Sequence, residues 1–148
     1  MRVTGRSRTG LLACSLLVAL VWPVRANDDQ DIWDVLTQAA SALSEGNARN
    51  FLAVFDRAMP EYNTLDANVN ALLDQCQVQS SIEILSQEGT GAMRNVELDW
   101  FLQIVQQQES AAVTRRRERV RCRLAKQGKK WRITSLEPMG FFAPPAQR

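Results

Sequence analysis

Regular alternation of apolar and polar residues in the second half of the chain is the feature that most constrains its fold. Two segments between residues 78 and 104 carry apolar side chains at alternate positions: Val78, Ile82 and Ile84 in the first, and Val96, Leu98, Trp100, Leu102 and Ile104 in the second. A period of two is typical of a strand that buries one face. Gly89-Thr90-Gly91 supplies a turn between them. The sequence therefore predicts a pair of long strands here.

A third strand is predicted where the chain is most basic. Thr114 to Leu124 reads TRRRERVRCRL, with six arginines in eleven residues. With a period of two, one face holds Val120, Cys122 and Leu124, and the other holds Arg117, Arg119, Arg121 and Arg123. Gln127-Gly128 is a hairpin signal, and a last strand carries Trp131, Ile133 and Leu136. Four antiparallel strands are expected.

The register of these strands follows from the predicted turns. A turn centred on Ser110 and a two-residue turn at Gln127-Gly128 would pair Trp100 with Val120, Leu98 with Cys122, Asp99 with Arg121, Glu97 with Arg123, Leu124 with Trp131 and Cys122 with Ile133. Apolar residues then meet on one face, and opposite charges meet on the other, where each pair contributes roughly 0.2–1 kcal/mol. We interpret the arginine stretch as the solvent-facing side of a sheet, with an acidic partner as the alternative.

The first half has a helical period instead. Ile32 to Leu43 repeats apolar residues at spacings of three and four, and Gly46-Asn47 ends that helix. A second helix is expected from Asn47 to the Met59-Pro60 break, and buries Phe51, Leu52, Val54 and Phe55. A third begins near Glu61 and carries Tyr62, Leu65, Val69, Leu72 and Leu73. Three helices are therefore predicted before the sheet.

The N-terminus predicts export. Three arginines precede a short apolar run from Leu11 to Trp22, and Val24 and Ala26 are small residues at positions −3 and −1 of a cleavage site. This pattern predicts a signal peptide over residues 1–26 and a periplasmic or secreted protein. An uncleaved anchor is a weaker alternative, because a span of about 30 Å needs roughly 20 apolar residues. Lipidation at Cys14 is weaker still, because most of the apolar run follows that cysteine.

Composition then restricts the function. Cleavage after Ala26 removes four of the 18 basic residues and none of the 16 acidic ones, so residues 27–148 are slightly acidic. No nucleic-acid partner and no stable membrane anchor after cleavage are expected. Histidine is absent, which removes the commonest general base and metal ligand. We expect no metal site and no cofactor.

Two cysteines remain in the exported part, Cys76 and Cys122. Export permits a disulfide between them. A simple meander argues against it, because the two residues then lie two strand spacings apart, roughly 9–10 Å, whereas a disulfide needs Cα atoms within about 7 Å. Both alternatives stay open at this point.

Two segments resemble the nuclear transport factor 2-like superfamily. GKKWRITSLEP (Gly128 to Pro138) is similar to the family's penultimate turn and final strand, and ALSEGNARNFLAVFDRAMPEY (Ala42 to Tyr62) is similar to its early helices. The resemblance implies an α+β cone in which three N-terminal helices pack on a curved four-stranded antiparallel sheet, as one domain over residues 27–148. The tail, residues 139–148, is expected on the surface or over the cavity mouth. The resemblance also implies a homodimer through the outer face of the sheet.

The superfamily includes enzymes that act inside the cone, binding proteins and many members without an assigned activity, so the fold alone does not imply a function. The concave face is predicted to be mostly apolar, with Trp100 and Phe55 available to a ligand. Glu118 is the one acidic residue on that face, and Tyr62 is the only tyrosine. We expect no catalytic residue and a non-catalytic module that binds a small apolar ligand, a peptide or a protein. The alternative is an isomerase, dehydratase or hydrolase that uses Glu118 and Tyr62.

Overall fold

The computed structural model describes residues 25–108 and 110–146. The elements are α1 (Arg25–Ser44), α2 (Ala48–Leu52), α3 (Tyr62–Gln75), β1 (Cys76–Glu88), β2 (Met93–Gln106), β3 (Val113–Gln127), β4 (Lys130–Glu137) and the 3-10 helix η1 (Met139–Phe142). The predicted signal peptide, residues 1–26, lies outside the described residues except for its last two, which begin α1. Its cleavage site stays a prediction. None of the helices in the described ranges is both long and apolar enough to span a membrane.

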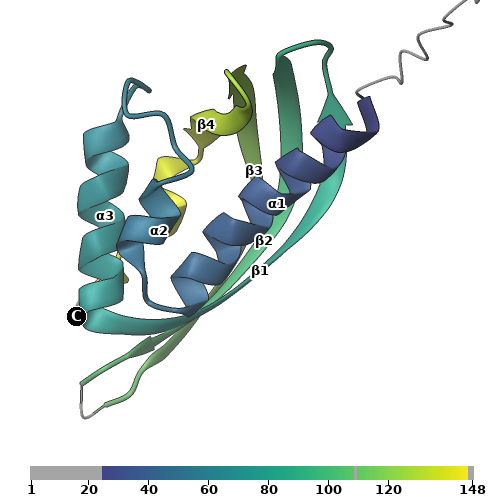
Figure 1. The fold of residues 1–148 in the computed structure, drawn as a ribbon. Helices are drawn as coiled ribbons and strands as arrows, with labels where there is room; N and C mark the ends of the chain where they lie inside the picture. The colour runs from purple at the N-terminus through teal and green to yellow at the C-terminus, as the bar shows by residue number, and fades with distance from the viewer. Residues whose placement is uncertain (1–24, 109, 147–148) are drawn as a thin grey trace, which may run out of the picture.

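The four strands form one antiparallel meander in the order β1-β2-β3-β4. Figure 1 shows the long sheet curving around α1, with α2 and α3 packed toward the end where β1 begins. The buried side of α1 includes Ile32, Leu36 and Leu43, each with no exposed surface, which agrees with the predicted helical period. The predicted fold class, three helices on a curved four-stranded antiparallel sheet, is confirmed.

The predicted faces of the strands are right, but their register is wrong. Leu98 lies opposite Val120 and Asp99 opposite Arg119, a shift of two residues from the predicted pairs. The backbone N–H of Gln106 donates to the carbonyl of Ala112 at 3.0 Å, so the loop is centred one residue earlier than Ser110. A shift of two preserves the face of every side chain, because the strand period is two.

The β3–β4 hairpin differs from the prediction in the same way. Gln127 pairs with Lys130, so the turn residues are Gly128 and Lys129, and Leu124 faces Ile133 instead of Trp131. An irregularity between Arg123 and Leu124 then moves the remaining pairs by one residue, and Cys122 lies opposite Leu136. Gly128 has φ +64°, which a glycine adopts without steric cost.

The predicted second helix is too long. It ends at Leu52, residues 53–54 form a turn, and Phe55 is bridged in parallel to Ile133 of β4. Ile133 N–H donates to the Val54 carbonyl at 2.8 Å, and Asp56 N–H donates to the Ile133 carbonyl at 2.8 Å. Hydrogen bonds to the edge of β4 thus replace those of a continued helix. Phe51, Val54 and Phe55 are buried as predicted, whereas Leu52 is half-buried.

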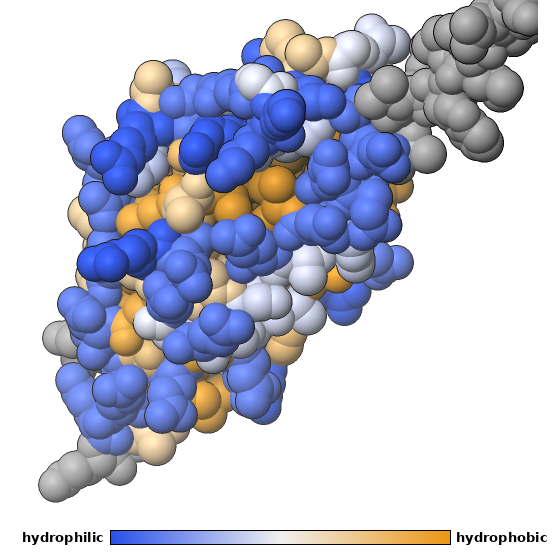
Figure 2. Space-filling model, viewed as in Figure 1, coloured by the Kyte–Doolittle hydropathy of each residue, from blue (hydrophilic) through white to orange (hydrophobic). Residues whose placement is uncertain are grey.

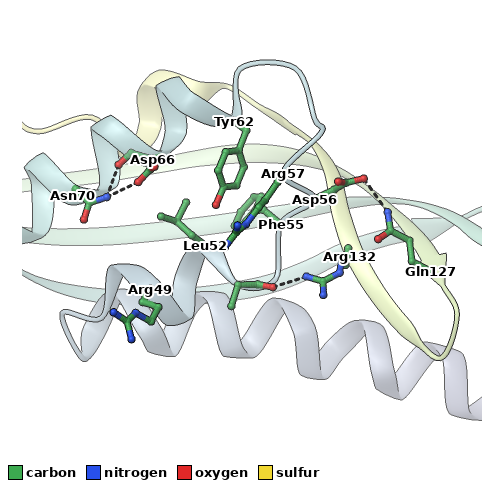
Figure 3. Close-up of a pocket in the computed structure, with 11 residues that line it drawn as sticks. Arg49, Leu52, Phe55, Asp56, Arg57, Tyr62, Asp66, Asn70, Gln127 and Arg132 are labelled. Atoms are coloured by element: carbon green, nitrogen blue, oxygen red, sulfur yellow. Dashed lines mark hydrogen bonds between the residues drawn. The ribbon is translucent and has the colours of Figure 1, made fainter.

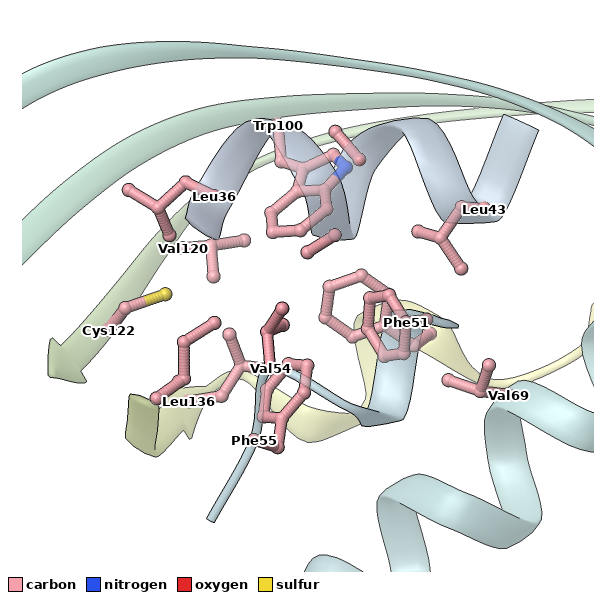
Figure 4. Packing of buried hydrophobic residues seen from close by; sticks show 14 of the residues in the cluster. Leu36, Leu43, Phe51, Val54, Phe55, Val69, Trp100, Val120, Cys122 and Leu136 are labelled. Carbon is pink, nitrogen blue, oxygen red and sulfur yellow. The ribbon is translucent and has the colours of Figure 1, made fainter. Parts of the chain in front are cut away.

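Two residues of the C-terminal tail belong to the core, so the surface alternative of the prediction is wrong for them. Phe141 and Phe142 of η1 are buried, and with Phe51, Phe55 and Trp100 they form an aromatic cluster inside the cone. Figure 4 shows the side chains of Trp100 and Phe51 pointing into this interior. Residues Phe141 and Phe142 lie in the short helix that begins after Pro138. Their burial stabilises the fold, because a tail on the surface would leave their apolar side chains in water.

Both cysteines of the described chain are free and buried. Cys76 lies opposite Gln106 at one end of β2, and Cys122 lies opposite Val96 near the other end. The disulfide that the sequence left open is therefore not formed. Burial raises the pKa of the Cys122 thiol to about 12, and burial also raises the pKa of Cys76. Both thiols stay protonated at neutral pH.

Candidate functional site

The interior of the cone is packed with the protein's own side chains. Trp100 has no exposed surface and donates its indole N–H to the Ser80 hydroxyl at 2.8 Å. Its ring centroid lies 5.0 Å from that of Phe142 in an edge-to-face arrangement, which is one of the geometries that aromatic pairs prefer. Arg116 holds the tail in place because its guanidinium donates to the carbonyl oxygens of Phe141 and Ala143. A ligand cannot reach Trp100 while η1 stays in this position.

An open groove lies outside the cone, between α2, the start of α3 and the β3–β4 hairpin. We call it the α2–α3 groove. Its volume is about 710 Å³, and it is lined by Arg49, Leu52, Ala53, Phe55, Asp56, Arg57, Tyr62, Asp66, Asn70, Gln127 and Arg132. The early end of α2 creates it, because the chain leaves the helix to pair with β4 and α3 begins only after residues 57–61. On the face of the molecule seen in Figure 2, apolar surface is visible between hydrophilic residues.

Three guanidinium groups line the α2–α3 groove. Arg132 Nη1 donates to the Ala53 carbonyl at 2.8 Å, which fixes one wall to the residue that follows α2. Arg49 and Arg57 are exposed, and within the described ranges neither side chain has a hydrogen-bond or ion-pair partner. Figure 3 shows the Arg57 side chain crossing Phe55, with the Tyr62 ring directed toward the same space. The groove therefore presents unpaired hydrogen-bond donors.

The two carboxylates of the groove are already engaged by the protein. Asp56 accepts from the backbone N–H of Ala58 at 2.9 Å and from Gln127 Nε2 at 2.8 Å. These bonds, the backbone one first, hold the pKa of Asp56 below its ordinary value of 3.8, because both stabilise the charged form. Asp66 accepts from Asn70 Nδ2, four residues along α3. Asp56 is ionised at neutral pH and is a poor proton donor.

The sequence-predicted site residues do not come together. Tyr62 and Phe55 both line the α2–α3 groove, although only Tyr62 has appreciable exposure. Trp100 belongs to the aromatic cluster. Glu118 lies opposite Trp100 in the sheet, and it is exposed and does not line the groove. The structure thus separates Glu118 from Tyr62.

Sequence reasoning missed the arginines of the groove. Arg57 follows Phe55 and Asp56, which were predicted to continue a helix. A continued helix would leave no groove at Arg57, so the groove was not predicted. Arg132 alternates with Trp131 and Ile133 in β4, and its alternation alone gives no sign of a groove. Within residues 25–108 and 110–146, no cluster of three or more histidine, cysteine or acidic residues could hold a metal ion. The expected lack of a metal site and a cofactor stays a prediction.

No model of a known protein family matches the chain, and no curated protein matches it in sequence. Solved structures do resemble it. A nuclear transport factor 2-like superfamily protein from Salmonella enterica superposes with a TM-score of 0.61 at 12% identity and covers 84% of this chain and 96% of its own. A protein of unknown function with the same fold, from Shewanella oneidensis, gives 0.58 at 12% identity, covering 74% and 96%.

An enzyme shares the architecture too. A hexachlorocyclohexane dehydrochlorinase superposes with a TM-score of 0.62 at 10% identity, covering 76% of this chain and 84% of its own. Identities this low carry the fold and no activity. The curved four-stranded sheet, the three helices and these superpositions agree with one another. The chain has the nuclear transport factor 2-like fold.

Proposed function

We propose that this protein is an exported, non-catalytic binding module whose ligand or partner occupies the α2–α3 groove. The observation that carries the proposal is the packing of the cone. Trp100, Phe141 and Phe142 fill the interior, where the fold's enzymes are expected to act, while a groove of about 710 Å³ stays open beside α3. Ligand sites usually occupy clefts of roughly 300–1,000 Å³, and the groove is within that range.

The arrangement of polar groups favours binding over catalysis. An enzyme of the isomerase, dehydratase or hydrolase type would need Glu118 and Tyr62 to reach one substrate. Glu118 is exposed on β3 and lies outside the groove that Tyr62 lines. Asp56 is held as a carboxylate by the Ala58 N–H and the Gln127 amide. A general base needs hydrogen-bond reach of the proton that it removes, and this geometry gives Glu118 no such position beside Tyr62.

The predicted apolar ligand inside the cone is less favoured than one in the groove. It would have to displace Phe142, which has no exposed surface and contacts Phe51 and Trp100 at centroid distances of 5.4 and 5.0 Å. In the groove, a ligand meets Leu52 and the ring of Tyr62, both of them half-buried. A small molecule or a peptide side chain with an apolar part suits this surface.

Nuclear magnetic resonance can test the location of the site. Amide spectra of the uniformly ¹⁵N-labelled protein are recorded with a panel of small neutral and charged aromatic compounds. The proposal expects shift changes that cluster at residues 49–57 and 62–70 and that Leu52→Glu abolishes. Leu85→Glu on β1, where Leu85 is 44% exposed, is the matched control and should keep the changes. Shift changes confined to the interior of the cone, or none with any compound, would contradict the proposal.

Export is tested separately from binding. The predicted cleavage after Ala26 would give a protein that begins at Asn27, and mass spectrometry of the chain recovered outside the cytoplasm measures this directly. A recovered chain that retains residues 1–26 would contradict the signal-peptide interpretation and would leave the groove proposal intact.

A further inference from the structure

We infer that the α2–α3 groove selects small organic anions, with a carboxylate or phosphate group on the guanidinium of Arg57 and an apolar body against Leu52 and Tyr62. This inference rests on the proposed function, since it assigns a ligand class to the same groove. It depends on the charges of the groove, the partners that those charges already have, and the shape of the apolar wall.

The charges of the groove are unequally satisfied. Its two acidic side chains accept hydrogen bonds within the protein, Asp56 from Gln127 and Asp66 from Asn70. Two of its three basic side chains, Arg49 and Arg57, have no side-chain partner in the described parts of the chain. Each carboxylate already has a partner within the protein, while two guanidiniums have all their donors available, and the lining holds three basic side chains against two acidic ones. The ligand class that complements this pattern is anionic.

Several arginines elsewhere in the fold are engaged by the protein itself. Arg117 pairs with Asp99 at 2.6 Å, and Arg119 pairs with Glu97 at 3.2 Å on the outer face of the sheet. Arg94 is buried, donates to the carbonyls of Gly91 and Met93, and lies over the Trp131 ring. Arg116 holds the C-terminal tail. These guanidiniums stabilise the protein itself. Arg115 and Arg121 are exposed on β3 and also have no side-chain partner in the described ranges, but neither lines the α2–α3 groove, as Arg57 does.

The chemistry of the donors narrows the ligand further. A guanidinium presents planar, parallel N–H groups that match both oxygens of a carboxylate or two oxygens of a phosphate. Tyr62 adds a hydroxyl that has no hydrogen-bond partner among the described residues and that points toward Arg57 in Figure 3. A neutral amide offers one uncharged carbonyl oxygen, so its hydrogen bonds to a guanidinium are weaker than the bidentate, charge-assisted bonds of a carboxylate. A single site can therefore distinguish an acid from its amide.

The apolar wall distinguishes an organic anion from an inorganic one. Leu52 and the Tyr62 ring are half-buried and exposed to the groove, and Phe55 lies behind them. The volume of about 710 Å³ exceeds what a lone phosphate would fill. Burial of apolar surface contributes roughly 25 cal/mol per Å², so an aromatic or aliphatic body should add to the affinity that the charge provides.

Isothermal titration calorimetry with matched probes tests the inference. Phenylacetate and phenyl phosphate carry the expected anion, phenylacetamide is the neutral isostere of phenylacetate, and inorganic phosphate has no apolar body. At low salt and neutral pH, each aromatic anion should bind at least about tenfold more tightly than phenylacetamide, which corresponds to a charge-assisted hydrogen bond. Inorganic phosphate should bind more weakly than phenyl phosphate. Added salt should weaken binding of both anions, because exposed charges are screened.

Substitutions then connect the affinity to the groove. Arg57→Gln should weaken the anions about tenfold or more and leave phenylacetamide unchanged, because the glutamine lacks the charge. Arg119→Gln on the outer face is the matched control and should change neither. Both positions are exposed, and a melting curve of each variant verifies that the fold is kept.

Two outcomes would overturn the anion inference alone, and a third would overturn the proposed function as well. Equal binding of phenylacetate and phenylacetamide, with amide shift changes in the groove, would overturn the anion inference and leave the binding module standing. Anion binding that Arg57→Gln does not weaken would overturn the inference as well, because the anion would then bind elsewhere. No binding of any aromatic probe up to about 10 mM, a concentration above that needed for even millimolar affinity, would overturn both.

Discussion

Replacing Phe142 with alanine should destabilise the protein more than any surface change can. Phe142 has no exposed surface, and its ring lies 5.0 Å from Trp100, 5.4 Å from Phe51 and 5.1 Å from Phe141 between centroids. Removing a buried phenylalanine side chain typically costs about 3–5 kcal/mol, which includes the cavity that remains. Domains of this size are stable by roughly 5–15 kcal/mol in total. We expect Phe142→Ala to fold with a large part of its stability lost.

Urea unfolding followed by circular dichroism measures this loss. The midpoint should fall while the denaturant slope stays constant, since the unfolded chain exposes nearly the same surface. At roughly 3–5 °C per kcal/mol for a chain of this length, the melting temperature should fall by about 10–25 °C. Leu85→Ala is the control, because an exposed side chain changes stability by about 0.5 kcal/mol or less. A loss below about 1 kcal/mol for Phe142→Ala would refute the packing of the tail in the core.

The variant also offers a second measurement with a different readout. The space vacated by the ring would be lined by Phe51, Phe141 and Trp100, and an apolar cavity of this kind stays dry and binds benzene. Benzene should therefore raise the melting temperature of Phe142→Ala by mass action and leave that of the wild-type protein unchanged. An equal shift in both proteins would mean that benzene binds away from the cone.

Three further predictions concern charge, thiols and assembly. A hydrogen bond from Lys126 lowers the pKa of Asp28 below 3.8. The stability that this bond gives the folded protein is present above pH 3.8 and is lost as the pH falls through the lowered pKa. Asp28→Asn should therefore reduce the melting temperature at neutral pH, and the difference in melting temperature between variant and wild type should vanish in acid. Thiol titration of residues 27–148 in denaturant should find two free thiols, and fewer than two would mean a disulfide. In the folded protein Cys122 should react slowly, because burial raises its pKa to about 12. The homodimer predicted through the outer face of the sheet should appear by sedimentation at tens of micromolar and weaken in Arg121→Glu, whereas a monomer at every concentration would contradict it.

The sequence was a good guide to faces and a poor guide to register. Val120, Cys122 and Leu124 are buried as the period of two requires, because burial of one face is encoded in every residue of a strand. The pairing of β2 with β3 depends instead on the residue at which the β2–β3 loop is centred. The backbone hydrogen bond from Gln106 to Ala112 places that centre one residue before the predicted one. Because the error is an even number of residues, the predicted inner and outer faces survive it.

The predicted length of the second helix is wrong because of tertiary contacts. Residues 53–55 have a helical pattern of apolar residues, but the edge of β4 offers hydrogen-bond partners to Val54 and Asp56 at 2.8 Å. Local propensity cannot include a partner that lies about 80 residues away in the chain, and tertiary contacts routinely override it. The burial of Phe141 and Phe142 was missed for the same reason, since their place in the core depends on the space that α3 and the sheet leave open.

The same limit explains why the site lies away from the feature that looked most functional. The arginine stretch concentrates positive charge in sequence, yet Arg117 and Arg119 pair with Asp99 and Glu97 across the outer face, and Arg116 binds the tail. A sequence shows how many arginines lie close together in the chain. Whether their guanidiniums can bind a ligand depends on which of them remain without a partner in the folded protein. That quantity becomes visible only in three dimensions, where Arg57 lies at an open groove beside Tyr62. Unpaired donors at an open groove therefore favour an anionic ligand, and a carboxylate introduced beside Arg57 would compete with that ligand for the guanidinium.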